Sequence, residues 1–332
     1  MPPTIHARLD PSLTARVLRS IPLLYADGAD PALDRPAHVR SASGVVRVGD
    51  RVAVIQDDAN FVALADPARG RARAITLPAG EGGLRQFDDV RGNKRHKLDL
   101  EAAVMLRDGD GEMLVAFGSG STPAREKILV VRGIASDTPH VRLVDASALY
   151  AKLRATSEFA GSELNVEGAA AVGGVLRLFN RGNGAVRDCV SPADASCDLD
   201  LAAFLAFLAA PATAPAPQPR DVALYELGDV DGQPLGFTDV SVRGDAVLYS
   251  AAAEASPDAT RDGPVAGSAI GIIRGGEARY AVVEVGGDRF TGKIEGLLPH
   301  PHDPARLWAV IDRDDPAAPS ELLDVSLGGS WT

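Results

Sequence analysis

The chain has 332 residues, of which 45% are apolar, and its formal net charge is −11. This apolar content is sufficient for a large core, and the acidic balance excludes a nucleic-acid partner because no basic field exists to attract phosphates. The longest apolar run, residues 199–210, is too short to cross a bilayer, and the first residues show no signal-peptide pattern. We therefore predict a cytoplasmic protein without a membrane partner.

Short apolar runs separated by Gly and Pro predict an all-β fold. Residues 1–12 are expected to form a flexible arm, and 13–332 a single domain. A strand is predicted over 14–21, and helical insertions are predicted at about 145–155 and 198–210. Strand units begin near residues 39, 98, 164, 237 and 293, and the fourth unit contains a long loop over 256–267.

The strand units repeat one pattern, in which an acid precedes a short apolar strand, then a turn and a second strand, although the first unit has a serine in place of the acid. The equivalent positions, 56 to 72 residues apart, are Ser43, Glu101, Glu167, Asp239 and Glu295. Repeats of this length and type predict a single β-propeller, with five blades counted and a sixth possible. The N-terminal strand is expected to pair with 321–327 and close the last blade.

In a propeller, the repeated acids would converge at one mouth of the central channel. Like charges this close recruit a cation or hold protons. Oxygen donors favour calcium, with magnesium or manganese as alternatives. The predicted metal ligands are Glu101, Glu167, Asp239, Glu295, Asp57, Asn165 and Asp312.

A structural explanation of the acids stays open beside the metal site. Each acid can cap a turn, or pair with a nearby cation. Lys97 precedes Glu101 by four residues, and Lys293 precedes Glu295 by two. Ion pairs of this kind would satisfy both acids without a metal.

Polar residues around these strands are candidates for holding an anionic substrate. A Gly-Ser-Gly-Ser stretch at 118–121 with a nearby Arg can offer N–H groups, hydroxyls and a cation, although such a stretch is more often an ordinary turn. No Walker A loop or nucleophile elbow is present. The predicted substrate-binding residues are Lys97, Ser119, Ser121, Arg125, Asn180, Arg181, Asn183, Glu254 and Lys293.

The motifs Asp99-Leu100-Glu101-Ala102, Asn165-Val166-Glu167-Gly168 and Lys293-Ile294-Glu295-Gly296 carry a family resemblance. With 118–121 and 180–183, they resemble an uncharacterised branch of the bacterial phytase-like (esterase-like-of-phytase) propellers. They are distantly similar to the gluconolactonase, regucalcin and paraoxonase propellers, which usually have six blades. In the lactonase group a strand-start Glu before Gly binds a divalent metal, and the resemblance implies this role for Glu167 or Glu295, with Glu101 third.

These observations predict a divalent-metal-dependent hydrolase of a phosphoester or lactone. The cation would polarise the substrate and activate a water, and an unligated Glu101 or Asp239 would act as general base. Lys97, Arg125 and Arg181 would hold the anionic part of the substrate. The alternative is a non-catalytic propeller that binds a ligand or a partner protein and whose acids are structural.

Overall fold

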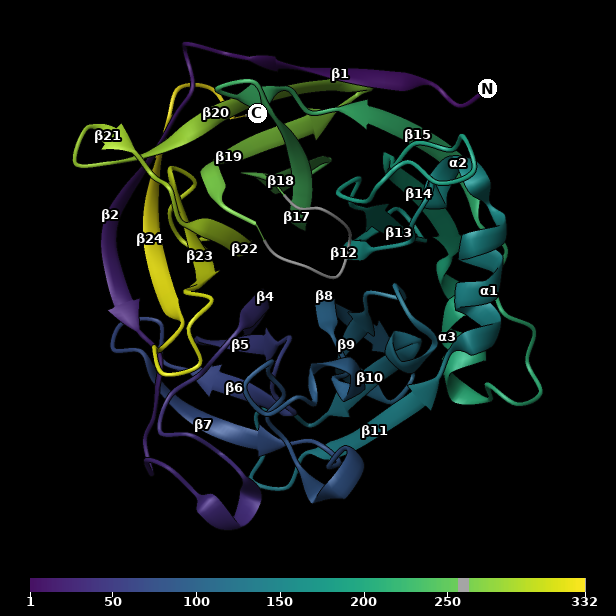
Figure 1. The fold of residues 1–332 in the computed structure, drawn as a ribbon, viewed down its shortest axis with the longest axis vertical. Helices are drawn as coiled ribbons and strands as arrows, with labels where there is room; N and C mark the ends of the chain where they lie inside the picture. The colour runs from purple at the N-terminus through teal and green to yellow at the C-terminus, as the bar shows by residue number, and fades with distance from the viewer. Residues whose placement is uncertain (256–262, 332) are drawn as a thin grey trace.

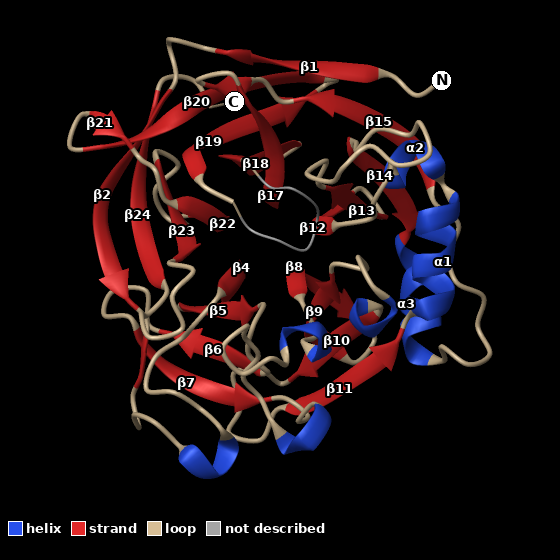
Figure 2. Cartoon of the chain, in the orientation of Figure 1, coloured by secondary structure: helices blue, strands red, loops and turns tan. Residues whose placement is uncertain are grey.

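The fold is described here from a computed structural model that covers residues 1–255 and 263–331, so most of the loop predicted over 256–267 lies outside the described residues. The chain is mostly β-strand with few helices (Figure 2). In the described ranges, no helix has the length and apolar character needed to cross a membrane.

Most strands belong to five antiparallel groups of four within the described part of the chain. The first group is β4 (Ala42–Val48), β5 (Arg51–Gln56), β6 (Phe61–Ala65) and β7 (Arg71–Thr76). The second is β8 (Leu100–Asp108), β9 (Gly111–Gly118), β10 (Lys127–Arg132) and β11 (His140–Asp145). The third is β12 (Val166–Val172), β13 (Val175–Asn180), β14 (Asp194–Asp200) and β15 (Arg220–Glu226). The fourth is β17 (Gln233–Arg243), β18 (Ala246–Glu254), β19 (Val265–Arg274) and β20 (Glu277–Val285).

The fifth group combines the two ends of the chain. It consists of β22 (Lys293–Pro299), β23 (Arg306–Asp312), β24 (Glu321–Gly328) and β2 (Thr14–Pro22). β2 pairs antiparallel with β24 from Thr14 opposite Gly328 to Pro22 opposite Glu321, so the predicted pairing of the N-terminal strand is confirmed. The five groups surround a common centre, with β4, β8, β12, β17 and β22 innermost (Figure 1).

The N-terminal residues form a strand, so the prediction of a loose arm is wrong for 4–9. β1 (Thr4–Leu9) runs parallel to β15 at 224–226 and to β20 at 278–280. The outermost strands of the third and fourth groups would otherwise present unpaired backbone groups at their edges. β1 therefore covers both edges and links the two groups.

The remaining elements lie outside the ring of innermost strands. Short strands are β3 (Leu24–Tyr25), β16 (Asp229–Val230) and β21 (Asp288–Arg289). Two helices fall in the predicted insertions, α1 (Ser147–Ala155) and α3 (Leu201–Ala209), and α2 (Ser157–Ala160) follows α1. Single 3₁₀ turns occur at Pro31–Leu33, Glu81–Gly83, Lys94–His96 and Pro123–Arg125. The helices flank the third group (Figure 2).

The core is divided into five layers, each between neighbouring groups. Aliphatic side chains of one group face those of the next, as Ile55 of β5 faces Leu114 of β9. The fifth and first groups share a layer of the same kind, in which Leu322 and Val310 pack with Val52. Burial of these apolar surfaces, at about 25 cal/mol per Å², holds the groups together, since neighbouring groups share few backbone hydrogen bonds.

Candidate functional site

Each innermost strand carries a β-bulge, which lies near the start of β4, β8, β12 and β22 and in the middle of β17. The pairing with the next strand shifts by one residue there, and the extra residues are Ser43, Glu101, Glu167, Thr238 and Glu295. A bulge turns the side chain of the extra residue away from the regular alternation, and bulges are frequent beside active sites. Four of these five side chains, all except Thr238, line a central cavity.

The bulges correct the predicted equivalence of Asp239. The residue equivalent to Glu101 and Glu295 is Thr238, so Asp239 occupies the next position. A shift of one residue sends a strand side chain to the other face. Asp239 is 2% exposed and does not line the cavity, and one carboxylate oxygen accepts a hydrogen bond of 2.8 Å from the N–H of Leu297. Asp239 therefore does not line the cavity in which its catalytic and metal-binding roles were predicted.

The cavity has a volume of about 280 Å³ and lies at one end of the innermost strands. Among the described residues it is lined by eleven carboxylates and six cations. The carboxylates are Asp57, Asp58, Asp88, Asp89, Asp99, Glu101, Glu167, Glu295, Asp312, Asp314 and Asp315, and the cations are Arg40, Lys94, Lys97, Arg125, Arg181 and Lys293. Asn165, Asn183, Ser41 and Ser43 add neutral polar groups. The predicted acids thus converge, apart from Asp239.

The residue after each bulge is Gly or Ala in four of the five innermost strands. These positions hold Gly44, Ala102, Gly168, Asp239 and Gly296. A Cβ on Gly296 would lie 2.9 Å from the Cα of Gly44, and one on Gly168 would lie 2.9 Å from a methyl of Val240. At Gly168 and Gly296 the strands therefore approach too closely for a larger side chain. A separate hollow near Val45, Ala103 and Ala170 shares no lining residue with the cavity.

The first and second groups contribute one network of charges. The ammonium of Lys97 contacts Asp57, lies 3.0 Å from an oxygen of Asp58 and lies 2.8 Å from an oxygen of Asp99. The guanidinium of Arg125 binds the second oxygen of Asp99 at 2.8 Å. Lys97, Arg125 and Asp99 are each about 5% exposed or less, so water screens these pairs weakly.

A second network runs through the third, fourth and fifth groups. Arg181 lies 3.4 Å from Glu167 and 2.7 Å from Glu254, and Lys293 lies 3.2 Å from Glu254 and 2.7 Å from Glu295. Acids and cations alternate along this chain of contacts. Glu254 is buried, does not line the cavity and contacts both cations.

Some of the remaining predicted polar residues line the cavity, and the others lie behind the residues that line it. Asn165 donates a hydrogen bond of 2.8 Å to Glu167 and one of 3.3 Å to Asn183, and all three line the cavity. Asn180 accepts a hydrogen bond of 2.7 Å from the N–H of Asn165 and lies behind it. Ser119 and Ser121 also lie behind the wall. Ser119 donates to Asp99, and Ser121 accepts a hydrogen bond of 2.8 Å from Arg125.

Glu101 differs from the other bulged acids in having no partner. Among the described residues, no side chain or backbone group forms a hydrogen bond or ion pair with its carboxylate. Burial raises its pKa well above the usual range, and the negative charges of Asp57, Asp99 and Glu167 raise it further. Lys97 opposes these effects in part. The neighbourhood of Glu101 therefore favours additional positive charge.

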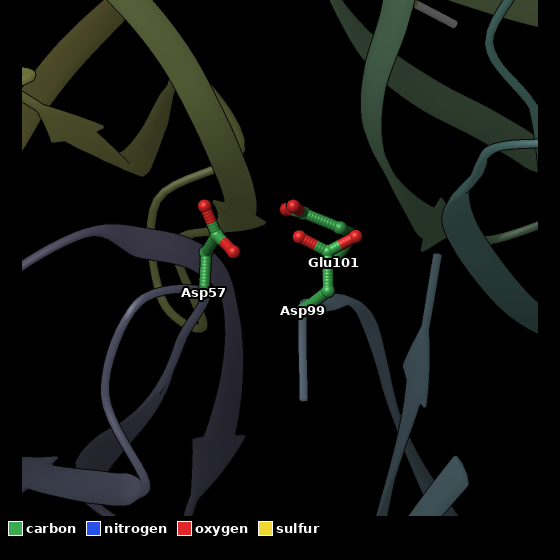
Figure 3. Close-up of side chains that lie close together, drawn as sticks. All are labelled: Asp57, Asp99 and Glu101. Atoms are coloured by element: carbon green, nitrogen blue, oxygen red, sulfur yellow. The ribbon is translucent and has the colours of Figure 1, made fainter. Parts of the chain in front are cut away.

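Three carboxylates gather closely at this point. One oxygen each from Asp57, Asp99 and Glu101 lie within 4.8 Å of one another, and the three side chains approach a common space (Figure 3). An all-oxygen donor set of this kind suits calcium, magnesium or manganese. Asp312, also predicted as a ligand, lines the cavity but accepts hydrogen bonds from Ser41 and Asp314 N–H groups.

Glu295, another acid that lines the cavity, has a pKa near neutrality. Burial raises the pKa of Glu295 to about 7, although Lys293 at 2.7 Å acts to lower it. Burial also raises the pKa of Glu167, against the opposing charges of Arg181 and Lys293. A carboxyl group with a pKa of about 7 can both accept and donate a proton at neutral pH.

Several wall residues were missed by the sequence analysis. Arg40 lies 3.2 Å from Asp88 and 3.7 Å from Asp58. Arg40 and Asp88 stand in connecting segments outside the repeated strand pattern, so the repeat gave no signal for them. Asp58 directly follows the predicted Asp57, and the paired acids after β5 were a usable signal for both.

Comparisons with known proteins show a family but no characterised relative. No curated protein matches the chain. An α-L-arabinofuranosidase from Podospora anserina in complex with cellotriose is similar at 11% identity and a TM-score of 0.44, over 96% of this chain and 97% of that one. An exo-1,5-α-L-arabinanase from a bovine ruminal metagenomic library is similar at 10% identity and a TM-score of 0.41, over 87% and 92%. The N-terminal domain of Nup159 is similar at 9% identity and a TM-score of 0.34, over 99% and 100%. Residues 38–327 match the model of a family described as a family of unknown function (DUF6929), and the chain belongs to this family.

Proposed function

We propose that the fold is a five-bladed β-propeller, in which each four-stranded group is one blade. Support comes from the five core layers between neighbouring groups and from the pairing of β2 with β24. The resemblance to phytase-like propellers and the cytoplasmic location remain predictions. Among the described residues, every strand of five or more residues except β1 belongs to one of the five groups, and a single strand cannot form a sixth blade.

We propose that the protein is a divalent-metal-dependent hydrolase of a small phosphoester or lactone. The observation that carries this proposal is the convergence of the bulged acids Glu101, Glu167 and Glu295 in one polar cavity. A cavity of about 280 Å³ admits a small molecule or the end of a larger one. The excess of carboxylates favours a cation there and, without one, repels an anionic substrate.

The proposed ligands of the cation are Asp57, Asp99 and Glu101. Their donor atoms suit calcium first, with magnesium and manganese as alternatives. When bound, the cation would polarise an ester or phosphoryl oxygen and lower the pKa of a water. Glu101 is thus assigned as a ligand, in place of its predicted role as general base.

Glu295 is the proposed proton-transfer group. It lines the same cavity, and its pKa of about 7 suits a group that takes a proton from water and returns it to a leaving oxygen. Arg125, Arg181, Lys97 and Lys293 already contact wall carboxylates. We therefore assign these cations to charge balance in the wall, and the substrate anion to the metal.

A second candidate function is ligand binding without chemistry, with a small molecule or a protein as partner. The contacts of Lys97 favour it, because an ammonium between Asp57, Asp58 and Asp99 supplies positive charge without a metal. The acids would then be structural, as the alternative explanation of the sequence allows.

Chelation distinguishes the two functions. Thermal melting after treatment with a chelator should give a lower Tm than melting in millimolar calcium, since an ion that binds only the folded state stabilises it. Glu101→Gln should abolish this difference, and Glu277→Gln, at an exposed position on β20, should retain it. A Tm that is independent of calcium and manganese contradicts metal dependence.

A substrate panel tests the chemistry itself. Chromogenic phosphoesters and lactones should be hydrolysed by the wild type, with kcat lowered about 10²- to 10⁴-fold in Glu295→Gln. Glu277→Gln is the matched control and should keep wild-type activity. Binding of a panel compound without turnover would instead support the ligand-binding function.

A further inference from the structure

Lys97 lies where an inorganic cation would be expected. Its ammonium contacts Asp57, Asp58 and Asp99, and the side chain is 5% exposed. An ammonium has three N–H donors, and three carboxylates receive them. The charge and the hydrogen-bonding capacity of Lys97 are both satisfied by this arrangement.

The same carboxylates would bind the proposed metal. Asp57 and Asp99 belong to the group of three acids within 4.8 Å, and both are contacted by Lys97. An ammonium and a divalent ion that share two carboxylates repel each other strongly in a poorly screened site. The two cations therefore cannot be held fully by Asp57 and Asp99 at the same time.

Asp58 gives the ammonium a second place to bind. It lies 3.0 Å from the Lys97 nitrogen but is not one of the three clustered acids. A lysine side chain is a compact charge on a flexible stem. Lys97 can therefore leave Asp57 and Asp99 while it stays paired with Asp58.

We propose that Lys97 is a tethered counter-ion that determines the affinity of the Asp57, Asp99 and Glu101 cluster for a divalent cation. The ion binds when the ammonium withdraws from Asp57 and Asp99 towards Asp58. Glu101 has no hydrogen-bond or ion-pair partner among the described residues, so Lys97 does not neutralise its carboxylate. This remaining negative charge attracts the divalent cation. This inference rests on the proposed function only in naming a divalent metal as the competitor.

Calorimetric titration of the full chain with Mn²⁺ and Ca²⁺ tests the inference. Lys97→Met should bind either ion about tenfold or more tightly than the wild type, because nearby unit charges shift ionic equilibria by one or more powers of ten. Lys94→Met is the matched control, since Lys94 lines the same cavity and lies 3.8 Å from Asp89. Its affinity should stay within about threefold of the wild type.

Lys97→Gln is measured in parallel, because removal of a buried cation lowers stability. If Lys97→Met is unfolded in chelator, its refolding on addition of Mn²⁺ supports the inference. If it does not refold, the test uses Lys97→Gln instead, which should bind Mn²⁺ or Ca²⁺ about tenfold or more tightly than the wild type.

The outcomes separate this inference from the proposed function. Metal binding by the wild type with equal or weaker binding by the Lys97 variants overturns the inference and leaves the metal-dependent function standing. Binding by the variants alone supports the inference and overturns that function. The absence of binding in every chain overturns both.

Discussion

Glu295 shows at the residue scale how burial and charge set a pH dependence. Its pKa is about 7 in the folded chain, against an ordinary value of 4.5. The groups that act on it are Lys293 and Arg181, which favour its ionised form, and Glu167, which disfavours it. Because the folded state binds the proton more tightly, the contribution of Glu295 to stability is present below about pH 4.5 and is lost as pH rises to about 7.

We therefore expect Glu295→Gln to be more stable than the wild type at pH 8, by about 1–3 kcal/mol, and of similar stability at pH 4.5. Glutamine resembles the protonated side chain, and Lys293 keeps its contact with Glu254. Urea unfolding in chelator from pH 4.5 to 8 measures the difference. A variant that is less stable than the wild type at pH 8 would show that the ionised pair with Lys293 dominates.

Asp239 is expected to be structural, in contrast to its predicted catalytic role. Asp239→Ala leaves the N–H of Leu297 without its acceptor and should cost about 1–3 kcal/mol. Asp239→Asn keeps an acceptor oxygen and should cost less than about 1 kcal/mol, with hydrolysis unchanged. Urea unfolding and the substrate panel together test this assignment. Loss of activity in a fully folded Asp239→Asn would return the residue to the mechanism.

At the scale of the element, the bulge and the small residue after it act together. Gly296→Ala would place a Cβ 2.9 Å from the Cα of Gly44 and 3.0 Å from the N of Val45, and backbone cannot move aside cheaply. We expect a loss of about 1–3 kcal/mol or more, measured by urea unfolding. Gly109→Ala is the control, since no atom lies within 4 Å of its Cβ position. Equal stability of the two variants would mean that the innermost strands tolerate separation.

The same element explains what the sequence could and could not reveal about the site. Glu101, Glu167 and Glu295 were found because each is an acid followed directly by Ala or Gly at the start of an apolar run. In β17 two polar residues are adjacent, Thr238 and Asp239, and strand alternation cannot tell which one is bulged. A bulge depends on pairing with the next strand, which the sequence of one strand does not contain.

At the scale of the whole molecule, the two N-terminal strands have different roles. β1 lies on exposed outer edges, whereas β2 is the fourth strand of the fifth group and contributes buried Ala15 and Ile21. Deletion of residues 1–12 should lower the Tm but leave a folded monomer. Deletion of 1–22 should abolish cooperative unfolding and cause aggregation, because the edge of β24 and its core layer become exposed.

Calorimetry and size-exclusion chromatography of the two deletions test the closure of the ring. A 1–22 deletion that is as stable as the full chain would contradict the role of β2. The sequence predicted β2 because its residues alternate and 321–327 offers a partner strand. It did not predict β1, although residues 4–9 alternate polar and apolar side chains and Ile5 and Ala7 pack against the core layer between the third and fourth groups. The parallel partners of β1, in β15 and β20, lie far away in the chain, so the sequence near β1 does not indicate them.

The central claim is that Glu101, at the bulge of β8, forms one cation site with the neighbouring Asp57 and Asp99. The most direct measurement is an anomalous difference map from crystals of the full chain soaked in Mn²⁺, compared with crystals soaked in chelator. We predict a peak among the carboxylates of Asp57, Asp99 and Glu101, with the Lys97 ammonium displaced towards Asp58. A map without a peak in the cavity, with Lys97 still on all three aspartates, would contradict the claim.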